Sequence, residues 1–296
     1  MKRAVAGSPG SVGGVTVTHP DRIVYPQTRI DKLEVARYYA AVAAQLLADV
    51  AGRPLSIVRC PRGIGATRFF QRHYSPGLGA HVHTVSVVEK SGRAAPYLYI
   101  DDERGLLELA QMDTIELHAW GARAANPDQP DRVIFDLDPA PGIAWPALIA
   151  AATQVRSQLR RARLESFVRL TGGKGLHIVA PLASGPSWIE VSAFCKGLAA
   201  RLVEEQPTIF VATAAKARRT DRIFIDWLRN SRGATSIANW SLRARPGAPA
   251  AVPLRWEELA ASKSGGDYDL RAAQRRAQRL ARNPWARFTR LQQRLP

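Results

Sequence analysis

Cysteine is nearly absent from this sequence: Cys60 and Cys195 are the only two, and they lie far apart in the chain. Such a pair excludes a disulfide framework and lacks the spacing of a structural zinc site, so we expect both to be buried apolar side chains in a reducing compartment. Long apolar runs are also lacking. No segment approaches the ~20 apolar residues of a membrane span, and the first residues hold no apolar signal core. We therefore expect a cytoplasmic protein with no membrane partner.

Acidic residues are scarce, 25 against 42 basic ones, which gives a formal net charge of +17. This excess favours a polyanionic partner, most simply nucleic acid, whose phosphates would be bound in a salt-dependent way. The alternative is a solubility effect or an arginine-rich coding bias. Residues 271–296 hold eight arginines and no acid. They predict a basic helix that stops near Pro284 and either follows a phosphate backbone or presents a solvated face with Leu280 turned inward.

The chain shows no internal repeat and no long linker, so we expect a single packed domain, 15–296, behind a flexible tail at 1–14. An N-terminal module is expected over 15–125. Its predicted elements are a strand-like run at 19–26, an alanine-rich helix over about 31–50, three short strands, a helix near 103–111 and a strand at 114–120.

A second module, 126–296, has a more diagnostic order of elements. The strand VIFDLD precedes a long helix, the strands ESFVRL and LHIVAPL are joined by TGGKG, and a helix near 188–205 leads into the strand RIFIDWL. This β-α-β-β-α-β order predicts an α/β (α+β) fold with the ferredoxin-like topology of RNA-recognition modules. In that topology the first and third strands are central neighbours, and the fourth lies on the other side of the first.

Three aspartates fall on these central strands. Asp136 and Asp138 are two residues apart and therefore project from one strand face. Asp226 on the fourth strand and His177 on the third can converge on the same face. Clustered carboxylates suit a pair of Mg²⁺ or Mn²⁺ ions about 3.5 to 4 Å apart, which would activate a 3′-hydroxyl for in-line phosphoryl transfer. The alternative is that Asp136 and Asp138 cap the following turn while Asp226 pairs with Arg229.

The segment LTGGKGLHIV, 170–179, is the second candidate. Its glycines allow backbone N–H groups to approach an anion, and Lys174 and His177 can add charge or hydrogen bonds. The segment does not match the phosphate loop G-x-x-x-x-G-K-[ST], because Gly175 stands where Ser or Thr is needed. Its place beside the aspartate strand favours a triphosphate cradle, and the alternative is a plain glycine-rich hairpin turn.

Two aromatic residues, Phe69 and Phe70, stand between basic residues in ATRFFQRH. They could stack on an exposed base or on the end of a duplex, or they could simply belong to the core. His118 and Arg243 are single polar residues in apolar strand contexts. Each could be a satisfied structural group or could reach into the site.

Several of these motifs together resemble a known family. FDLDP, TGGKGLH, IFIDWLRN and SLRARPGAPAAVPLRWEEL are similar, in the same order, to the polymerase domain of bacterial ligase D, of the archaeo-eukaryotic primase superfamily. The resemblance covers nearly the whole chain. It implies a primase-polymerase fold in which the ferredoxin-like module packs on the N-terminal module.

The resemblance also implies an activity and its setting. It implies a nucleotidyltransferase that uses NTP or dNTP substrates, with a preference for ribonucleotides, and a two-metal site with Mn²⁺ or Mg²⁺. The enzyme would extend ends and fill gaps during bacterial non-homologous end joining, in the nucleoid-associated cytoplasm. The implied partners are DNA with gaps, breaks or 3′ overhangs, Ku, and a ligase domain in cis or in trans.

The family's functional residues have matches in this sequence. The metal-binding and catalytic aspartates match Asp136, Asp138 and Asp226. The nucleotide contacts match Thr171, Lys174, His177, His118 and Arg243, with Arg219 a weaker match. The pocket for the downstream 5′-phosphate matches Lys32, Arg22 and His19, and the template contacts match Phe69 and Phe70.

Four positions depart from the family pattern. Thr171 stands where Ser is common and keeps the hydroxyl, and Arg22 stands where Lys is expected, which changes the geometry offered to a phosphate. Trp240 replaces an expected Tyr, and Asp221 replaces an expected Gly and puts an extra acid near the site.

Two rival functions are open at this point. A haloacid-dehalogenase-like phosphatase also begins with an apolar strand and D-x-D, but here Ala140 stands where Thr or Val is expected and a downstream G-D-x-x-x-D is missing. A non-catalytic nucleic-acid-binding module of primase fold is the other rival, which the presence of all three aspartates disfavours. The K-x-D-G motif of ligases is also missing, so we do not expect this chain to seal nicks.

Overall fold

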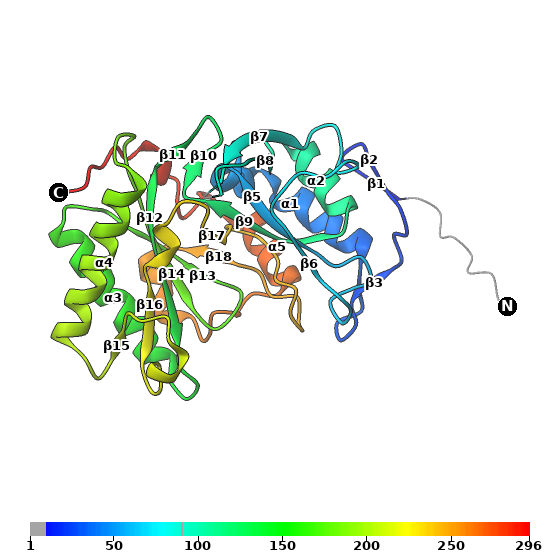
Figure 1. The fold of residues 1–296 in the computed structure, drawn as a ribbon. Helices are drawn as coiled ribbons and strands as arrows, with labels where there is room; N and C mark the ends of the chain where they lie inside the picture. Colours follow the sequence, from blue (N-terminus) through cyan, green and yellow to red (C-terminus); the bar gives the residue numbers. More distant parts are fainter. Residues whose placement is uncertain (1–9, 90) are drawn as a thin grey trace. The chain divides into compact units, whose positions relative to one another are not determined.

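The computed structural model describes residues 10–89 and 91–296, which form two compact units (Figure 1). Unit 1 comprises Met1–Ala119, Ile237–Ala250 and Tyr268–Leu280, and unit 2 comprises Trp120–Ser236, Ala251–Asp267 and Ala281–Pro296. The two units therefore do not follow the expected division at residue 125, because two late segments of the chain, Ile237–Ala250 and Tyr268–Leu280, belong to unit 1. Of the predicted tail, residues 1–9 lie outside the described residues, and Gly10–Val12 form a strand that pairs with Val15–Val17.

Unit 1 is built from short strands and three helices among its described residues. Its elements are β1 (Gly10–Val12), β2 (Val15–Val17), β3 (Ile23–Tyr25), β4 (Ile30–Asp31), α1 (Lys32–Val50), β5 (Leu55–Arg59), β6 (Phe69–Gln71), β7 (His83–Val88), β8 (Ala94–Tyr99), α2 (Glu103–Gln111), β9 (Thr114–Trp120) and α5 (Leu270–Arg279). The strands β9-β5-β8-β7 lie in that order in one antiparallel sheet, and β6 pairs with β5.

The helices of unit 1 begin where the sequence offers a carboxylate cap. Asp31 accepts a hydrogen bond from the Glu34 N–H (2.8 Å), so the predicted alanine-rich helix starts at Lys32. Helix α1 packs against both α2 and α5. The basic run near the C-terminus is helical as predicted, and it buries Leu270, Ala273 and Ala277, while Leu280 is half-buried just after its end.

The predicted strand-like run at 19–26 is a strand only at Ile23–Tyr25. His19 has a left-handed φ of 51°, and its carbonyl accepts a hydrogen bond from the Arg22 N–H (3.1 Å). Residues 19–22 therefore form a turn, which the proline and aspartate after His19 favour.

Unit 2 contains the predicted β-α-β-β-α-β series. Its strands and α-helices are β10 (Ala122–Arg123), β11 (Asn126–Pro130), β12 (Arg132–Pro139), α3 (Trp145–Arg161), β13 (Phe167–Leu170), β14 (Leu176–Pro181), α4 (Trp188–Glu205), β15 (Phe210–Val211), β16 (Ile223–Asp226) and β18 (Val252–Leu254). Its 3₁₀ helices are η1 (Lys216–Arg218), η2 (Leu228–Asn230), η3 (Trp256–Ala261) and η4 (Phe288–Arg290), and β17 (Thr235–Ile237) spans the junction to unit 1.

The central sheet of unit 2 has the order β15-β16-β12-β14-β13-β18. The first predicted strand, β12, lies between β14 and β16, and it is antiparallel to both, so the predicted ferredoxin-like arrangement of the four strands is confirmed. Two short strands were not predicted. β15 extends one edge in parallel with β16, and β18 extends the other edge beside β13.

Helices α3 and α4 pack on β12 from the sheet face that bears Phe135 and Leu137, whose side chains are fully buried (Figure 1). Helix α4 begins with a capping box between Ser187 and Glu190. It buries Cys195 against the sheet, and Cys60 is buried in unit 1, so both cysteines are free and buried as predicted. Among the described residues, no helix combines the length and the apolar character needed to cross a membrane.

Candidate active site

The carboxylates on the sheet of unit 2 share one face, as strand alternation predicted. The antiparallel register places Asp136 opposite His177 on β14 and opposite Asp226 on β16. Directly opposed residues in a sheet project to the same side, and Asp138 follows two positions along β12. The opposite side carries Phe135 and Leu137 under the helices. Three aspartates and a histidine therefore gather on the sheet face opposite α3 and α4.

Basic side chains hold each of these carboxylates. Arg229 contacts two of them, Asp136 at 3.3 Å and Asp226 at 3.2 Å, so the Asp226–Arg229 pair considered as an alternative is present. Asp138 lies 3.1 Å from Lys174 and 3.9 Å from Arg219.

The pKa of Asp226 shows that this compensation is incomplete. Burial raises its pKa, the charge of Arg229 opposes this, and Asp136 raises it further. A carboxyl in this position gains from any additional cation that comes near.

His177 is buried and uncharged beside Asp136. Its Nδ1 accepts a hydrogen bond from Arg169 Nε (3.1 Å), which leaves Nε2 to carry the proton toward Asp136, 3.5 Å away. The pKa of His177 is lowered to about 4, chiefly by burial; Asp136 opposes this shift, and the charges of Arg169 and Arg229 add to it. The ring is therefore a neutral hydrogen-bond donor at pH 7 rather than a second cation.

The ligand atoms of this face suit a hard divalent cation. Asp136, Asp138 and Asp226 offer only carboxylate oxygens, the donors that Mg²⁺ and Mn²⁺ prefer, and Asp226 lies directly opposite Asp136 in the strand register. In the part of the chain that the structure describes, no three His, Cys, Asp or Glu residues converge closely enough to form a finished cage. The residues thus fit the chemistry of such an ion, with Arg229 and Lys174 neutralising the carboxylates in this arrangement.

The TGGKG segment is a tightly packed loop rather than an open hairpin. The Thr171 hydroxyl donates to the Gly175 carbonyl (2.9 Å). A Cβ at Gly175 would collide with the carbonyl oxygen of Leu137, and a Cβ at Gly265 would lie 2.7 Å from the Gly175 carbonyl oxygen. Glycine is therefore required at both positions by close backbone approach. The loop delivers Lys174, whose Nζ donates to the Pro139 carbonyl (3.0 Å) at the end of β12.

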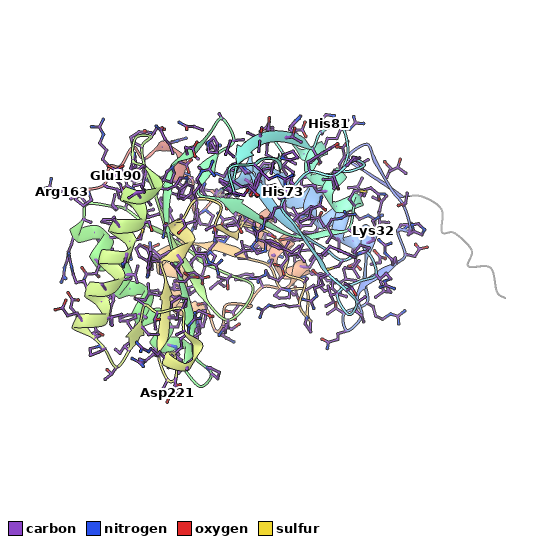
Figure 2. All side chains as sticks on the ribbon, in the orientation of Figure 1. Lys32, His73, His81, Arg163, Glu190 and Asp221 are labelled. Atoms are coloured by element: carbon purple, nitrogen blue, oxygen red, sulfur yellow. The ribbon has the colours of Figure 1, made fainter. Side chains whose placement is uncertain are left out.

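A pocket of about 420 Å³ opens beside Asp138, between the TGGKG loop and the segment before β16. Lys174 and Arg219 supply its positive charge, and the Arg219 guanidinium lies 3.6 Å from the centre of the Phe224 ring. Asp221, labelled in Figure 2, lines the same pocket in a left-handed conformation (φ 53°). That conformation explains why glycine suits this position, and aspartate is among the few other residues that tolerate it.

In unit 1, His118 and Arg243 meet on a shared carboxylate, Glu116. The His118 ring lies 2.7 Å from Glu116, Arg243 lies 3.2 Å from it, and the Ala244 N–H donates to it (2.8 Å). Burial alone would raise the pKa of Glu116, but the hydrogen bond from His118 and the charge of Arg243 outweigh it and lower the pKa to about 2. Both predicted nucleotide contacts are therefore held in place by one carboxylate that is ionised at neutral pH.

The other predicted contacts of unit 1 fall into an exposed pair and a buried cluster. Phe69 and Phe70 on β6 are 54% and 55% exposed, which excludes the alternative that they belong to the core. Lys32, labelled in Figure 2, is only 3% exposed and lies 3.3 Å from Asp113, which also pairs with Arg22. Burial lowers the pKa of Lys32 and the charge of Arg22 adds to this, against the attraction of Asp113. His19 has an exposed side chain in the turn before Arg22.

Three residues that hold these groups were not predicted from the sequence: Glu116, Arg169 and Asp113. Glu116 is two residues from His118 on β9, and Arg169 is opposite His177 in the register of β13 and β14. Strand alternation could have found both. Asp113 gives no comparable signal, because it is 81 residues from Lys32 and lies in a tight turn with φ 66°.

Comparisons with known proteins agree with this geometry. The sequence model of the family described as "LigD, primase-polymerase domain" matches residues 31–285. The multifunctional non-homologous end joining protein LigD of Pseudomonas aeruginosa is 36% identical over 299 residues, which cover 99% of this chain and 35% of that protein. LigD of Mycolicibacterium smegmatis is 34% identical over 248 residues, which cover 83% of this chain and 32% of that protein.

A solved structure is similar over almost the whole chain. It is the polymerase domain from Mycobacterium tuberculosis ligase D in complex with DNA, with a TM-score of 0.87 and 31% sequence identity, and the match covers 95% of this chain and 99% of that one. This likeness agrees with the α/β fold predicted from the sequence. The chain spans about a third of the length of the curated relatives that it matches.

Proposed function

The chain belongs to the family of the LigD primase-polymerase domain, and we propose that it extends the 3′ end of a DNA strand by template-directed nucleotidyl transfer. Membership in a polymerase family implies the use of a divalent metal and of nucleoside triphosphates in general. The observation that carries the proposal for this chain is the register that sets Asp136 opposite both His177 and Asp226.

Within this proposal the aspartates hold two divalent ions, Mn²⁺ or Mg²⁺. Metal bound there would lower the pKa of the 3′-hydroxyl and neutralise charge on the triphosphate. Lys174 and Arg219, which flank Asp138 at the pocket, bind phosphate oxygens, and the Thr171 hydroxyl holds the loop that carries Lys174. Neutral His177 donates a hydrogen bond from Nε2, and the buried Arg169 fixes its tautomer. His118 and Arg243 add contacts to the nucleotide.

The DNA contacts that we propose lie in unit 1. Exposed Phe69 and Phe70 offer flat surfaces for an unpaired template base or a duplex end. Arg22 and Lys32, with His19 nearby, bind the 5′-phosphate of a downstream strand in exchange for Asp113. The expected DNA substrates are gaps, breaks and 3′ overhangs. Because the relatives are bacterial end-joining proteins of about three times this length, we propose that Ku and a ligase domain act with it at the nucleoid.

The proposal is tested by incubating the chain with a gapped, 5′-phosphorylated duplex, labelled nucleoside triphosphates and Mn²⁺. We expect templated addition by the wild type and loss of at least about a thousandfold in rate for Asp136→Ala, since metal-site carboxylates act directly on charge in the transition state. Glu204→Ala is the matched control, because Glu204 is exposed on α4 of the same unit. Full activity of Asp136→Ala would reject the site, and no templated addition by the wild type would reject the function.

Two further arms of the same assay address substrate and metal. We expect faster addition of ribonucleotides than of deoxyribonucleotides, and activity with Mn²⁺ at least equal to that with Mg²⁺. A different result would favour the non-catalytic nucleic-acid-binding module. In that case the wild type, Asp136→Ala and Glu204→Ala would bind the duplex equally well, and none of them would add a nucleotide. The three aspartates would then serve only in the ion pairs that they form with Lys174 and Arg229.

A further inference from the structure

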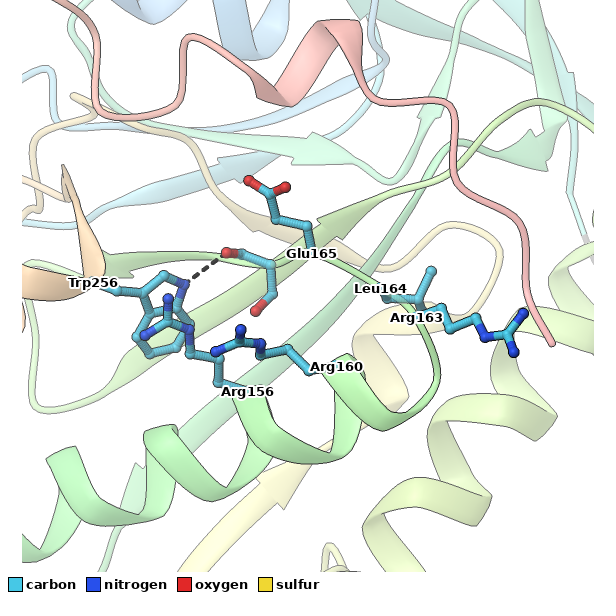
Figure 3. Close-up of a pocket in the computed structure, with 7 residues that line it drawn as sticks. Arg156, Arg160, Arg163, Leu164, Glu165 and Trp256 are labelled. Carbon is cyan, nitrogen blue, oxygen red and sulfur yellow. Dashed lines mark hydrogen bonds between the residues drawn. The ribbon is translucent and has the colours of Figure 1, made fainter.

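A second basic pocket lies in unit 2, at the C-terminal end of α3. It has a volume of about 300 Å³, and Figure 3 shows the residues that line it, drawn from α3, from the segment that leads into β13 and from η3. Helix α3 packs on β12 and β14 through buried side chains such as Val155 and Leu159. The aspartates project from the other face of that sheet, so this pocket is separate from the candidate active site.

Two arginines of α3 give the pocket its charge. Arg156 and Arg160 are four residues apart and therefore neighbours on one side of the helix. Within the described residues, neither guanidinium forms an ion pair or a hydrogen bond with another group of the chain. Burial, and then the charge of Arg160, lower the pKa of Arg156. The charges of Glu257 and Glu165 oppose this shift, but neither carboxylate forms an ion pair with Arg156 or Arg160 in the part of the chain that the structure describes.

An aromatic ring orients one of these arginines. The Arg156 guanidinium lies over the Trp256 ring, 4.6 Å from its centre, and Trp256 Nε1 donates to the Ser166 carbonyl (2.6 Å) (Figure 3). A guanidinium stacked on an aromatic face keeps its N–H edge free for a bidentate acceptor, and its side chain is already ordered. Arg156 is therefore held in position before any ligand arrives.

The pocket also contains a buried polar group without a partner. The Ser166 side chain is only 5% exposed, and among the described residues its Oγ has no hydrogen-bond partner. An unsatisfied buried hydroxyl is unfavourable, and an acceptor inside the pocket would relieve that cost.

The acid in the pocket is engaged elsewhere. Glu165 pairs with Arg287 at 3.2 Å, and Figure 3 shows its carboxylate directed away from Arg156 and Arg160. Glu165, the acid among the lining residues, is therefore already paired, and the exposed Glu257, which also acts on Arg156, does not line the pocket.

We propose that Arg156, Arg160 and the Ser166 hydroxyl form a binding site for a phosphate group, separate from the catalytic face. The planar forks of two arginines and a hydroxyl donor match the several oxygens of a phosphate better than the two oxygens of a carboxylate. The phosphate comes either from a free nucleotide or from the backbone of a nucleic acid, and the +17 charge of the chain favours the second source.

The test reads Trp256 directly. The whole chain is labelled with 5-fluorotryptophan, and the Trp256 resonance is assigned by its loss in Trp256→Phe. Divalent metal is left out so that the aspartate face does not take up nucleotide with its metal. Inorganic phosphate, a nucleoside monophosphate and a single-stranded oligodeoxynucleotide are then titrated separately, and a glutamate-rich peptide serves as a fourth arm.

We expect a saturable shift of the Trp256 resonance with phosphate compounds. Arg160→Gln should weaken the apparent affinity about tenfold, the effect of losing one charge-assisted contact. Arg161→Gln is the matched control, because Arg161 is the next residue of α3, is exposed and does not line the pocket. A shift with the oligonucleotide alone identifies a nucleic-acid phosphate, and a shift with phosphate and monophosphate as well identifies a site for free phosphates.

Three results would overturn the proposal. They are no saturable shift in any phosphate arm, equal affinities of the Arg160→Gln and Arg161→Gln variants, and a shift with the glutamate-rich peptide alone, which would make the pocket a peptide site.

Discussion

Two carboxylates position several of the predicted nucleotide and DNA contacts through ion pairs. Glu116 and Asp113 each hold two basic groups in place, and each is itself buried or nearly so. Removing such a carboxylate leaves buried positive charge uncompensated, and protonating it does the same. Stability should therefore change when pH or a substitution removes the charge of either carboxylate.

Glu116 should make stability depend on pH at the acid end. Its folded pKa of about 2 lies below the ordinary value of 4.5, so the folded state binds fewer protons than the unfolded state between these values. The stability it contributes is therefore complete above about pH 5 and is lost as pH falls toward 2. We expect Glu116→Gln to remove on the order of 2 to 3 kcal/mol of this pH-dependent stability, measured by urea unfolding from pH 7 to 3.

Glu204→Gln serves as the control for that measurement, because Glu204 is exposed on α4. Its unfolding free energy should follow the wild-type curve throughout. Parallel curves for wild type and Glu116→Gln would mean that Glu116 does not carry the dependence.

Arg22 is a better probe of the proposed 5′-phosphate contact than Lys32. Charge reversal at Lys32 would bury a second carboxylate against Asp113, so loss of folding would obscure the result. Arg22→Gln keeps the Lys32–Asp113 pair and removes one bidentate donor. We expect it to lower the preference for 5′-phosphorylated over unphosphorylated gaps about tenfold, with simple primer extension unchanged.

Arg29→Gln gives the same charge change at an exposed position seven residues away. That variant should keep the wild-type preference in the same gap-filling assay. Equal preference in Arg22→Gln and Arg29→Gln would remove Arg22 from the phosphate pocket.

Among the elements of the candidate site, the TGGKG loop is held by close contacts with the backbone around it. Because a Cβ at Gly175 meets the Leu137 carbonyl, Gly175→Ala must move either the loop or the end of β12 that bears Asp138. We expect a loss of about 1 to 3 kcal/mol in unfolding free energy and a fall in the rate of nucleotide addition.

The matched control for this change is Gly197→Ala in α4, where a Cβ has open space. In a helix interior that substitution should stabilise by up to about 1 kcal/mol and leave the rate unchanged. If Gly175→Ala proved as stable and as active as Gly197→Ala, the loop would not be held by this contact.

The sequence predicted well those elements in which apolar residues recur at regular helical or strand spacing. The helices α1, α2 and α4 were placed within about a residue or two of their observed ends, because each combines apolar spacing with a side-chain cap or a clear boundary. The strands β15 and β18 have only two and three residues, too few to show alternation, so the sheet edges were missed. The shared face of the aspartates was predictable because it needs only alternation and strand order.

At the scale of the whole molecule, the excess of basic residues is plain from composition, but the way the chain divides was not predictable from it. Unit 1 is closed by two segments encoded after most of unit 2. The Tyr38 hydroxyl donates to the Trp240 carbonyl (2.7 Å), and the Asn239 N–H donates to Asp49 (2.9 Å). Buried polar atoms of α1 thus depend on partners about two hundred residues away, which no local pattern reveals.

We therefore expect a fragment of residues 1–119 not to fold alone. It lacks the acceptor of Tyr38 and the cover that α5 gives to α1. Near-ultraviolet circular dichroism and amide hydrogen exchange should show little fixed packing in the fragment, in contrast to the full chain. A fragment that melted cooperatively with native-like aromatic ellipticity would contradict this dependence.

The interleaving of the two units also sets an order of events on the ribosome. Tyr38 is translated 202 residues before its acceptor, an interval of about 10 to 40 s at ordinary elongation rates. The four central strands β12, β13, β14 and β16 are all complete by Asp226, before either closing segment of unit 1 exists. Nascent chains stalled after residue 236 should thus already protect these four strands from protease while α1 is still cut. The sheet that bears the aspartates would then form before unit 1 is closed, although unit 2 itself is completed only by its last segment, Ala281–Pro296.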